Sequence, residues 1–148
     1  MKKSKKLVKI LNTLLATYQI HYQNLRALHW NIRGNDFFEI HAKYEELYLR
    51  TQTIIDDLAE RILTLESQPL HSYQSYLDKS VIAENEHIAD ARVGMSYVVK
   101  AQEELLKLER EILSLSDELE DEGTNSLASD LIGEKEKTNW MFKAWINK

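Results

Sequence analysis

The chain has 148 residues, of which 43% are hydrophobic, and its formal net charge is −5 at pH 7. This length predicts one domain, 1–148, with a full-sized core, and the negative charge argues against nucleic-acid binding over the whole surface. Because the chain has no cysteine, disulfides and thiolate metal sites are excluded, and imidazole and carboxylate remain as metal ligands. No apolar run is long enough to span a membrane and no apolar signal segment follows the start, so we expect a cytoplasmic location.

The chain starts with a short basic arm, MKKSKK, at 1–6. The lysines of this arm are Lys2, Lys3, Lys5 and Lys6. Such an arm can contact the phosphates of DNA, or it can be a solvated, frayed terminus. We favour the second interpretation for a single chain, because the arm is short and the rest of the chain is negative, but an oligomer would present several arms together.

A first helix is predicted over 7–32, because apolar residues recur there at steps of three and four. The recurring positions are Leu11, Leu14, Leu15, Tyr18, Tyr22, Leu25 and His29. His29 continues the stripe, where a lone histidine is usually a core residue. The residues RGN at 33–35 then break the helix, and Asp36 with Glu39 is expected to form a capping-box-like pair for the next one.

A second helix is predicted over 37–66. Its expected core stripe is Tyr44, Leu47, Tyr48, Thr51, Ile55, Leu58, Ile62 and Leu65. Asp56 and Glu60 are expected to flank this stripe, where carboxylates are costly unless they are paired or bound to a cation. They are either a solvated pair, with Glu60 bridged to Arg61 or Arg50, or part of a metal site.

The segment 67–88 is too long for a tight turn and is expected to hold a short helix at SYQSYL. Glu84 and His87 in this segment have the Glu-x-x-His spacing of di-iron bundles, but such bundles need the motif on two helices, so we interpret the pair as surface residues. A long helix is predicted over 89–119. Its heptad seam, which favours a bundle helix, is Val98, Ala101, Leu105, Leu108, Ile112, Leu115 and Leu119.

An acidic segment, SDELEDEG at 116–123, precedes the last predicted helix. The charge there either complements the helix dipole or forms an acidic funnel for cations around a symmetry axis. Thr124 or Asn125 is expected to cap the last helix, which runs to about Ile146. The residues expected to face inward are Leu127, Leu131, Thr138, Met141 and Trp145.

Four potential ligands share one stripe of the second helix. A helix turns about 100° per residue, so Glu45 lies at about 40°, Asp56 at about 60° and Glu60 at about 100° from His41. Asp56 is also about 22 Å further along the axis, whereas metal–ligand bonds are about 2 Å long. One helix therefore cannot bring His41 and Asp56 to one ion.

Either the stripe holds two unrelated features, or a second copy of the chain completes the site. If two copies of this helix pack antiparallel about a two-fold axis, the histidine end of one meets the carboxylate end of the other. Such a contact generates two identical sites. We take this arrangement as the leading hypothesis.

The chain resembles the Dps family, the small ferritin-like DNA-binding proteins of starved cells that are also called mini-ferritins. The resemblance spans nearly the whole chain and is carried by HWNIRG at 29–34, FFEIHAKYEELY at 37–48, DDLAERI at 56–62 and EKEKTNWMFKAW at 134–145. The spacing is its specific part: twelve residues from His29 to His41, fifteen to Asp56 and four to Glu60. These are the ligand spacings of the family's ferroxidase site.

The resemblance implies an all-α, ferritin-like four-helix bundle with a long crossover connection that carries a short extra helix. It also implies a hollow shell of twelve subunits with a two-iron site at each two-fold interface. His29 and His41 would come from one subunit, and Asp56 and Glu60 from its partner. The other residues implicated by position are Glu45 near the second iron, Trp30 beside the site, and Asp121, Glu122 or Asp130 at acidic pores.

The activity that the resemblance implies is oxidation of Fe(II) to Fe(III), with hydrogen peroxide as oxidant, storage of ferric mineral in the shell, and protection against oxidative stress. Carboxylate and imidazole suit iron, and Glu60 is the best candidate to bridge two ions. The alternative is a nucleoid-associated protein that protects DNA through its lysine arm. A bundle that has lost its metal site is disfavoured by the complete ligand set.

Overall fold

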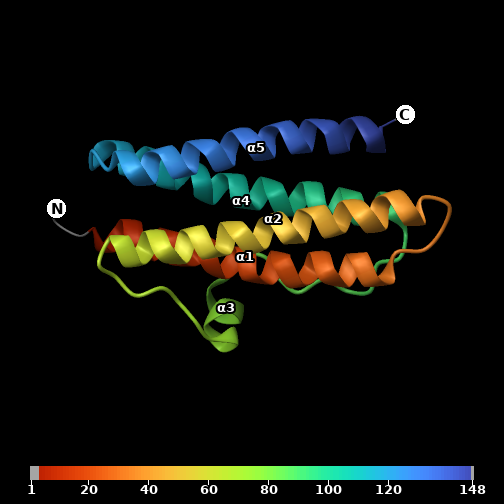
Figure 1. The fold of residues 1–148 in the computed structure, drawn as a ribbon, viewed down its shortest axis with the longest axis horizontal. Coiled ribbons are helices and arrows are strands. Elements are labelled where there is room, and N and C mark those ends of the chain that lie inside the picture. Colours follow the sequence, from red (N-terminus) through yellow and green to blue (C-terminus); the bar gives the residue numbers. More distant parts are fainter. Residues whose placement is uncertain (1–3, 148) are drawn as a thin grey trace.

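The computed structural model describes residues 4–147, which form five helices and no strand. These helices are α1 (Lys5–Asn31), α2 (Phe37–Thr64), α3 (Tyr73–Lys79), α4 (Ala91–Glu118) and α5 (Glu122–Ile146). The four long helices form a bundle in which α1 pairs with α2 and α4 with α5, while the short α3 lies outside the bundle against α1 (Figure 1). None of the described helices combines the length and the hydropathy that a membrane crossing requires.

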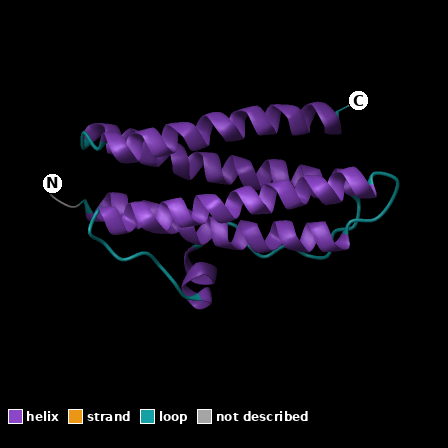
Figure 2. Cartoon of the chain, viewed as in Figure 1, coloured by secondary structure: helices purple, strands orange, loops and turns teal. Residues whose placement is uncertain are grey.

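The connection between α2 and α4 sets the topology. It leaves the end of α2, passes through α3 and runs back along the bundle to the start of α4, so α2 and α4 point in the same direction (Figure 2). The helices within each pair are antiparallel and joined by short turns. The all-α four-helix bundle with a long crossover and a short extra helix is therefore confirmed.

The start of α1 lies earlier than predicted. The Ser4 side chain accepts a hydrogen bond from the Leu7 amide, which caps the helix at residue 4. Lys5 and Lys6 therefore belong to the first turn of α1, and Leu7 is already buried. Lys2 and Lys3 lie outside the described residues.

Two further caps differ from the predictions. Asp36 makes no side-chain capping hydrogen bond to α2, so the expected capping box with Glu39 does not start that helix. The cap of α5 is Asp121, whose carboxylate accepts from the Thr124 amide. The helix therefore begins at Glu122 instead of after Thr124 or Asn125, and it continues through Gly123, because a capped first turn outweighs the low helix propensity of one glycine.

The predicted inward face of α5 is largely wrong. Met141 and Trp145 are exposed, and of the predicted set only Leu131 is buried. Apart from Leu131, the buried residues of α5 are Thr124, Ala128, Lys135, Asn139 and Phe142. A search for apolar side chains misses this face, because two of its central positions hold polar residues whose hydrogen bonds lie inside the bundle.

A buried charged cluster joins three helices at the centre of the bundle. Glu109 of α4 is fully buried, the hydroxyl of Tyr18 in α1 donates to its Oε2 atom, and Lys135 Nζ of α5 lies 3.1 Å from the same oxygen. Burial raises the pKa of Glu109 and lowers that of Lys135, and the attraction between the two charges opposes both shifts. Because neither buried charge is solvated by water, each one stabilises the other in its charged form.

We predict that Lys135→Met lowers the free energy of unfolding by about 3–5 kcal/mol, because it leaves a buried carboxylate without its cation. Urea unfolding at one fixed protein concentration measures the change. Lys137→Met, at an exposed position of the same helix, is the control and should stay within about 0.5 kcal/mol of the unsubstituted protein. The double variant Lys135→Met/Glu109→Gln should recover much of the loss; a double variant no more stable than Lys135→Met would contradict the explanation.

Candidate metal centre

Two histidines at the turn between α1 and α2 hold each other in place. The Nδ1 atom of each ring, His29 and His41, lies 2.7 Å from the backbone carbonyl oxygen of the other residue. The two rings stack with their centroids 3.7 Å apart. Because a carbonyl oxygen only accepts, each Nδ1 is the donor. In the neutral imidazoles both Nε2 atoms therefore keep a lone pair, which is the form that binds a metal ion.

Glu45, one turn after His41, adds a carboxylate to this pair. Its Oε1 atom lies 3.6 Å from His29 Nε2. When His29 is neutral, both atoms are electron-pair donors, so a cation between them is favourable. Two ligand atoms that each lie about 2 Å from one ion are at most about 4 Å apart. The separation therefore fits two ligands of one ion.

Aromatic rings pack against both histidines. Phe37 stacks on His41 with centroids 4.8 Å apart, and Tyr48 meets His29 edge-on at 5.3 Å. Trp30 follows His29 and is 58% exposed, and the guanidinium carbon of Arg26 lies 4.9 Å from its ring centroid. The rings restrict the histidines on their buried sides, whereas Trp30 faces outward beside them.

The prediction that Asp56 and Glu60 flank the buried stripe of α2 is wrong, because both are exposed. The buried residues of α2 lie between about 220° and 300° from His41, which puts these two carboxylates on the opposite, outward face. The proposed bridges from Glu60 do not form either: Arg61 pairs with Asp121, and Arg50 pairs with Glu134. Glu84 and His87 are exposed, as expected of surface residues.

The structure places the predicted ligands in two groups on one chain. His29, His41 and Glu45 lie near the α1–α2 turn, while Asp56 and Glu60 lie toward the other end of α2. Among residues 4–147, no three His, Asp or Glu side chains are grouped closely enough to hold a metal ion. Glu45, Asp56 and Glu60 are exposed, whereas His29 is buried, and neither group forms a closed site of its own.

Large apolar side chains share this outward face of α2. Phe38 is 84% exposed, Leu63 57% and Leu49 50%. They lie at about 60°, 40° and 80° from His41, among the angles of the ligands. These three residues were not among the predicted site residues, although the same helical angles place them on this face. An apolar surface interleaved with carboxylates is typical of a face that another protein surface covers.

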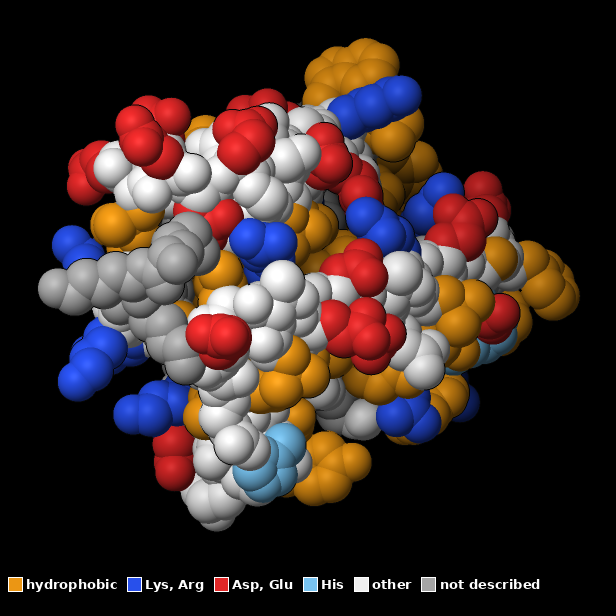
Figure 3. Space-filling model, turned by 60° about the vertical axis from the view of Figure 1, so that its left-hand side comes forward, with side chains coloured by type: hydrophobic (Ala, Val, Ile, Leu, Met, Phe, Trp, Pro, Cys, Tyr) orange, Lys and Arg blue, Asp and Glu red, His pale blue; other side chains and the backbone are white. Residues whose placement is uncertain are grey.

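Acidic side chains gather over the end of the bundle where α4 turns into α5 (Figure 3). Asp121 is an exception within this group, since its carboxylate is buried and accepts from Arg61 Nη2 at 2.8 Å and from the Thr124 hydroxyl at 2.6 Å. These partners make it a structural link between α2 and α5. Glu122 and Asp130 are exposed, and their role at a pore stays a prediction.

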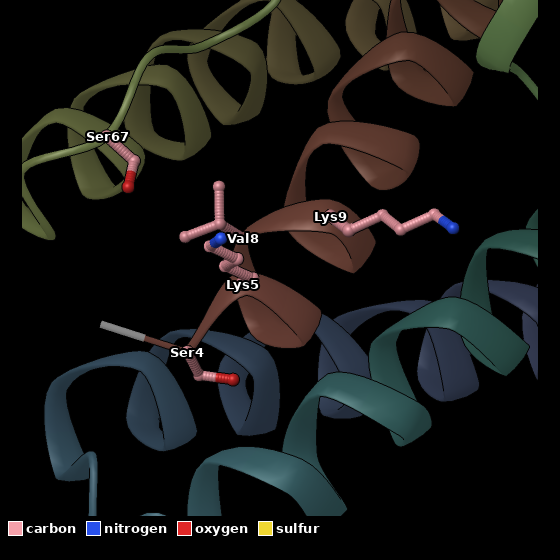
Figure 4. Close-up of a pocket in the computed structure, with 5 residues that line it drawn as sticks. All are labelled: Ser4, Lys5, Val8, Lys9 and Ser67. Carbon is pink, nitrogen blue, oxygen red and sulfur yellow. The ribbon is translucent and has the colours of Figure 1, made fainter. Parts of the chain in front are cut away.

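A shallow hollow of about 400 Å³ lies beside the start of α1. Ser4, Lys5, Val8, Lys9 and Ser67 line it, and Lys9 extends away from Ser67 (Figure 4). The two lysines therefore do not converge on one point as a dedicated phosphate site would require.

The chain is similar to ferritin-like proteins over nearly its whole length. The model of the ferritin-like domain family matches residues 8–148. An uncharacterized protein of Haemophilus influenzae is 46% identical over 134 residues, covering 90% of this chain and 84% of its own. The DNA protection during starvation protein 2 of Bacillus anthracis is 31% identical, covering 98% of this chain and 99% of its own.

A solved structure is similar over almost the same range. It is the crystal structure of a Dps protein from Vibrio cholerae O1, described as a member of a broad superfamily of ferritin-like diiron-carboxylate proteins. The two chains are 49% identical, the match covers 98% of this chain and 91% of the other, and the TM-score is 0.96. The similarity therefore includes the four-helix bundle, the crossover and the short extra helix.

We predict that Asp121→Ala lowers the free energy of unfolding by about 1–3 kcal/mol, because it removes a helix cap and leaves Arg61 without its partner. The neighbouring Glu122→Ala should change it by no more than about 0.5 kcal/mol, since Glu122 is exposed. Urea unfolding of both variants at equal protein concentration makes the comparison. Equal stabilities would argue against the structural role of Asp121.

Proposed function

The chain belongs to the Dps family of ferritin-like proteins, and on that basis we propose that it oxidises ferrous iron and stores the ferric product. The observation that carries the proposal is the histidine pair of α1 and α2. Its two Nε2 atoms are left bare by the Nδ1 hydrogen bonds, and a carboxylate oxygen of Glu45 lies 3.6 Å from one of them. Imidazole and carboxylate together suit iron in both oxidation states. Iron is here the substrate.

Each site is shared between two subunits related by a two-fold axis. His29 and His41 of one subunit bind iron together with Asp56 and Glu60 of the partner copy, and Glu45 contributes to the second iron. Two features support this arrangement: the ligands on α2 form two distant groups on one face of the helix, and exposed Phe38, Leu49 and Leu63 lie among them. An isologous contact of this face buries the apolar residues and completes two sites at once.

The reaction uses two ferrous ions and one hydrogen peroxide. Each ion gives one electron, the peroxide bond breaks, and two protons complete two waters, so no one-electron product of peroxide is released. We infer that Glu60 bridges the two ions and that the histidines hold one of them. Carboxylates then stabilise the ferric product, because hard oxygen ligands suit the higher charge.

Twelve subunits form a hollow shell in which the ferric mineral collects. Ferrous ions reach the shell through acidic pores that draw on Glu122 and Asp130. The curated relatives' names refer to protection of DNA in starved cells, which supports a role against oxidative stress in the cytoplasm.

DNA binding is the second candidate function. Lys5 and Lys6 lie in the first turn of α1, near Lys9, while Lys2 and Lys3 precede the described residues. A shell would present many copies of this lysine group, and multivalent contact with phosphates strengthens weak single contacts.

We predict that wild-type protein oxidises ferrous iron rapidly with equimolar peroxide, at about two irons per peroxide, and that Asp56→Ala/Glu60→Ala slows this at least about 10-fold, the loss seen even for residues that only support metal ligands. Stopped-flow absorbance of ferric iron measures both. Asp57→Ala is the matched control, because Asp57 is an exposed carboxylate adjacent to Asp56 but about 100° around the helix. Equal oxidation rates in all three proteins would show that iron is oxidised at another site.

Sharing of the site is tested in the same assay with mixed chains. His41→Ala and Asp56→Ala shells are each expected to be inactive. After dissociation and joint reassembly of equal amounts, half of the dimers are mixed and each keeps one complete site, so about a quarter of the wild-type activity should return. No recovery in correctly reassembled shells would place both ligand groups in one subunit.

For the DNA candidate, we predict that replacing Lys2, Lys3, Lys5 and Lys6 by glutamine weakens DNA binding and flattens its salt dependence, because phosphate contacts are lost. Glutamine is preferable to truncation, since truncation would remove the Ser4 cap and the buried Leu7. The control replaces four exposed lysines elsewhere, Lys79, Lys100, Lys107 and Lys137. Equal DNA affinities of the two variants in the gel-shift assay would contradict a role of the lysine arm in DNA binding.

A further inference from the structure

Tyr18 is a buried tyrosine whose hydroxyl already has a proton acceptor. Its side chain is 1% exposed and the hydroxyl donates to Oε2 of Glu109. Burial, reinforced by the charge of Glu109, raises the pKa of Tyr18 well above its ordinary value, so the phenol keeps its proton at neutral pH. A phenol in hydrogen-bond contact with a carboxylate can nevertheless pass its proton to that carboxylate in the same step in which the ring loses an electron.

A row of aromatic rings leads from the histidine pair toward Tyr18. His29 meets Tyr48 edge-on with ring centroids 5.3 Å apart, and Tyr48 meets Tyr22 edge-on at 5.9 Å. Tyr22 and Tyr18 are one turn apart on α1, where residues four apart are neighbours on the same face. The row thus begins at a metal-facing histidine and ends at a tyrosine with a carboxylate partner.

Exposure falls along this row. Tyr48 and Tyr22 are half-buried, whereas Tyr18 is enclosed by the bundle. Lys135 Nζ lies 3.1 Å from Glu109 Oε2 and 4.9 Å from the ring centroid of Tyr18. The charge of Lys135 lowers the pKa of Glu109 and so opposes the rise that burial causes. An electron vacancy that reaches Tyr18 is therefore kept away from solvent.

We propose that Tyr48, Tyr22 and Tyr18 form an electron relay that quenches one-electron oxidants at the iron site, with Tyr18 as the final donor. The relay rests on the proposed function, because the oxidant arises when peroxide meets a site that holds one ferrous ion instead of two. That ion supplies one electron, and peroxide splits into hydroxide and a hydroxyl radical. The missing second electron then comes from the protein.

The electrons and protons of this step balance. The hydroxyl radical takes one electron through Tyr48 and Tyr22 and becomes hydroxide. Tyr18 loses that electron, its O–H proton moves to Glu109, and a neutral tyrosyl radical remains beside a protonated carboxyl group. A second ferrous ion that later binds at the site gives one electron back along the row and becomes ferric. The proton returns from Glu109 to Tyr18, so the relay is restored.

The test loads the wild-type shell with less than one ferrous ion per site, adds peroxide and freezes the sample rapidly for electron paramagnetic resonance. Protein made with ring-deuterated tyrosine identifies a tyrosyl radical by its narrowed signal. We expect this radical in wild type and its loss in Tyr18→Phe and in Tyr22→Phe. A spin trap in solution should capture more hydroxyl radical from both variants than from wild type.

Tyr73→Phe is the matched control, because Tyr73 is 85% exposed on α3, outside the row, and it should keep the wild-type signal. Wild-type radical and spin-trap yields in both relay variants would overturn the relay. Should Tyr18→Phe fail to fold, as judged by helical circular dichroism and shell size, Tyr22→Phe decides alone. If iron-saturated wild type does not consume one peroxide per two irons, the proposed function and the relay both fall, whereas normal consumption without a Tyr18-dependent radical overturns the relay only.

Discussion

The bundle depends on one buried charge and its partner. Glu109 is fully buried at the centre of the four helices, where an unpaired carboxylate would be prohibitively costly. Lys135 and Tyr18 meet it from α5 and α1, so three helices are tied at one oxygen atom. A lysine ammonium already occupies the place that a cation would take in the core. The candidate metal ligands lie away from this cluster, and Glu45, Asp56 and Glu60 of α2 are exposed.

The second organising feature is the exchange of hydrogen bonds between His29 and His41. Each backbone carbonyl orients the other residue's ring, so the two Nε2 atoms are aligned without any help from a carboxylate. The ends of α1 and α2 position each other in the same way. The orientation of the ligands is therefore a property of one chain, whereas the completion of the site is proposed to require a second.

Much of the fold could be predicted from the sequence, because the helices show a clear periodicity of apolar residues. The four long helices and the seam from Val98 to Ile112 follow from the spacing of apolar residues, whereas the long crossover with its short helix was implied by the resemblance to the Dps family. The structure confirms these features. The argument that His41 and Asp56 cannot share an ion within one helix needs only the rise per residue. The ligand assignments and their sharing between subunits stay predictions.

The incorrect predictions for α4 and α5 mostly concern positions where polar side chains pair across helices. Lys135 and Asn139 are buried because Lys135 pairs with Glu109 and Asn139 accepts a hydrogen bond from Gln102, both on α4. The sequence pattern of α5 alone does not reveal such partners. Leu119 of the predicted seam is 40% exposed for a related reason: α4 ends at Glu118 and the chain has already turned. Asp121 was grouped with its acidic neighbours by charge, whereas Arg61, sixty residues earlier, decides its role.

Arg61 has a further consequence, because it directly follows Glu60 along α2. The turn that presents Glu60 outward is anchored from inside by the contact of Arg61 with Asp121 and Thr124 at the first turn of α5. The backbone of a candidate iron ligand is thus clamped to the opposite layer of the bundle. On the proposed function, a substitution at the acidic turn between α4 and α5 would therefore disturb the position of Glu60 as well, and a defect at the proposed pore would be coupled to one at the proposed iron site.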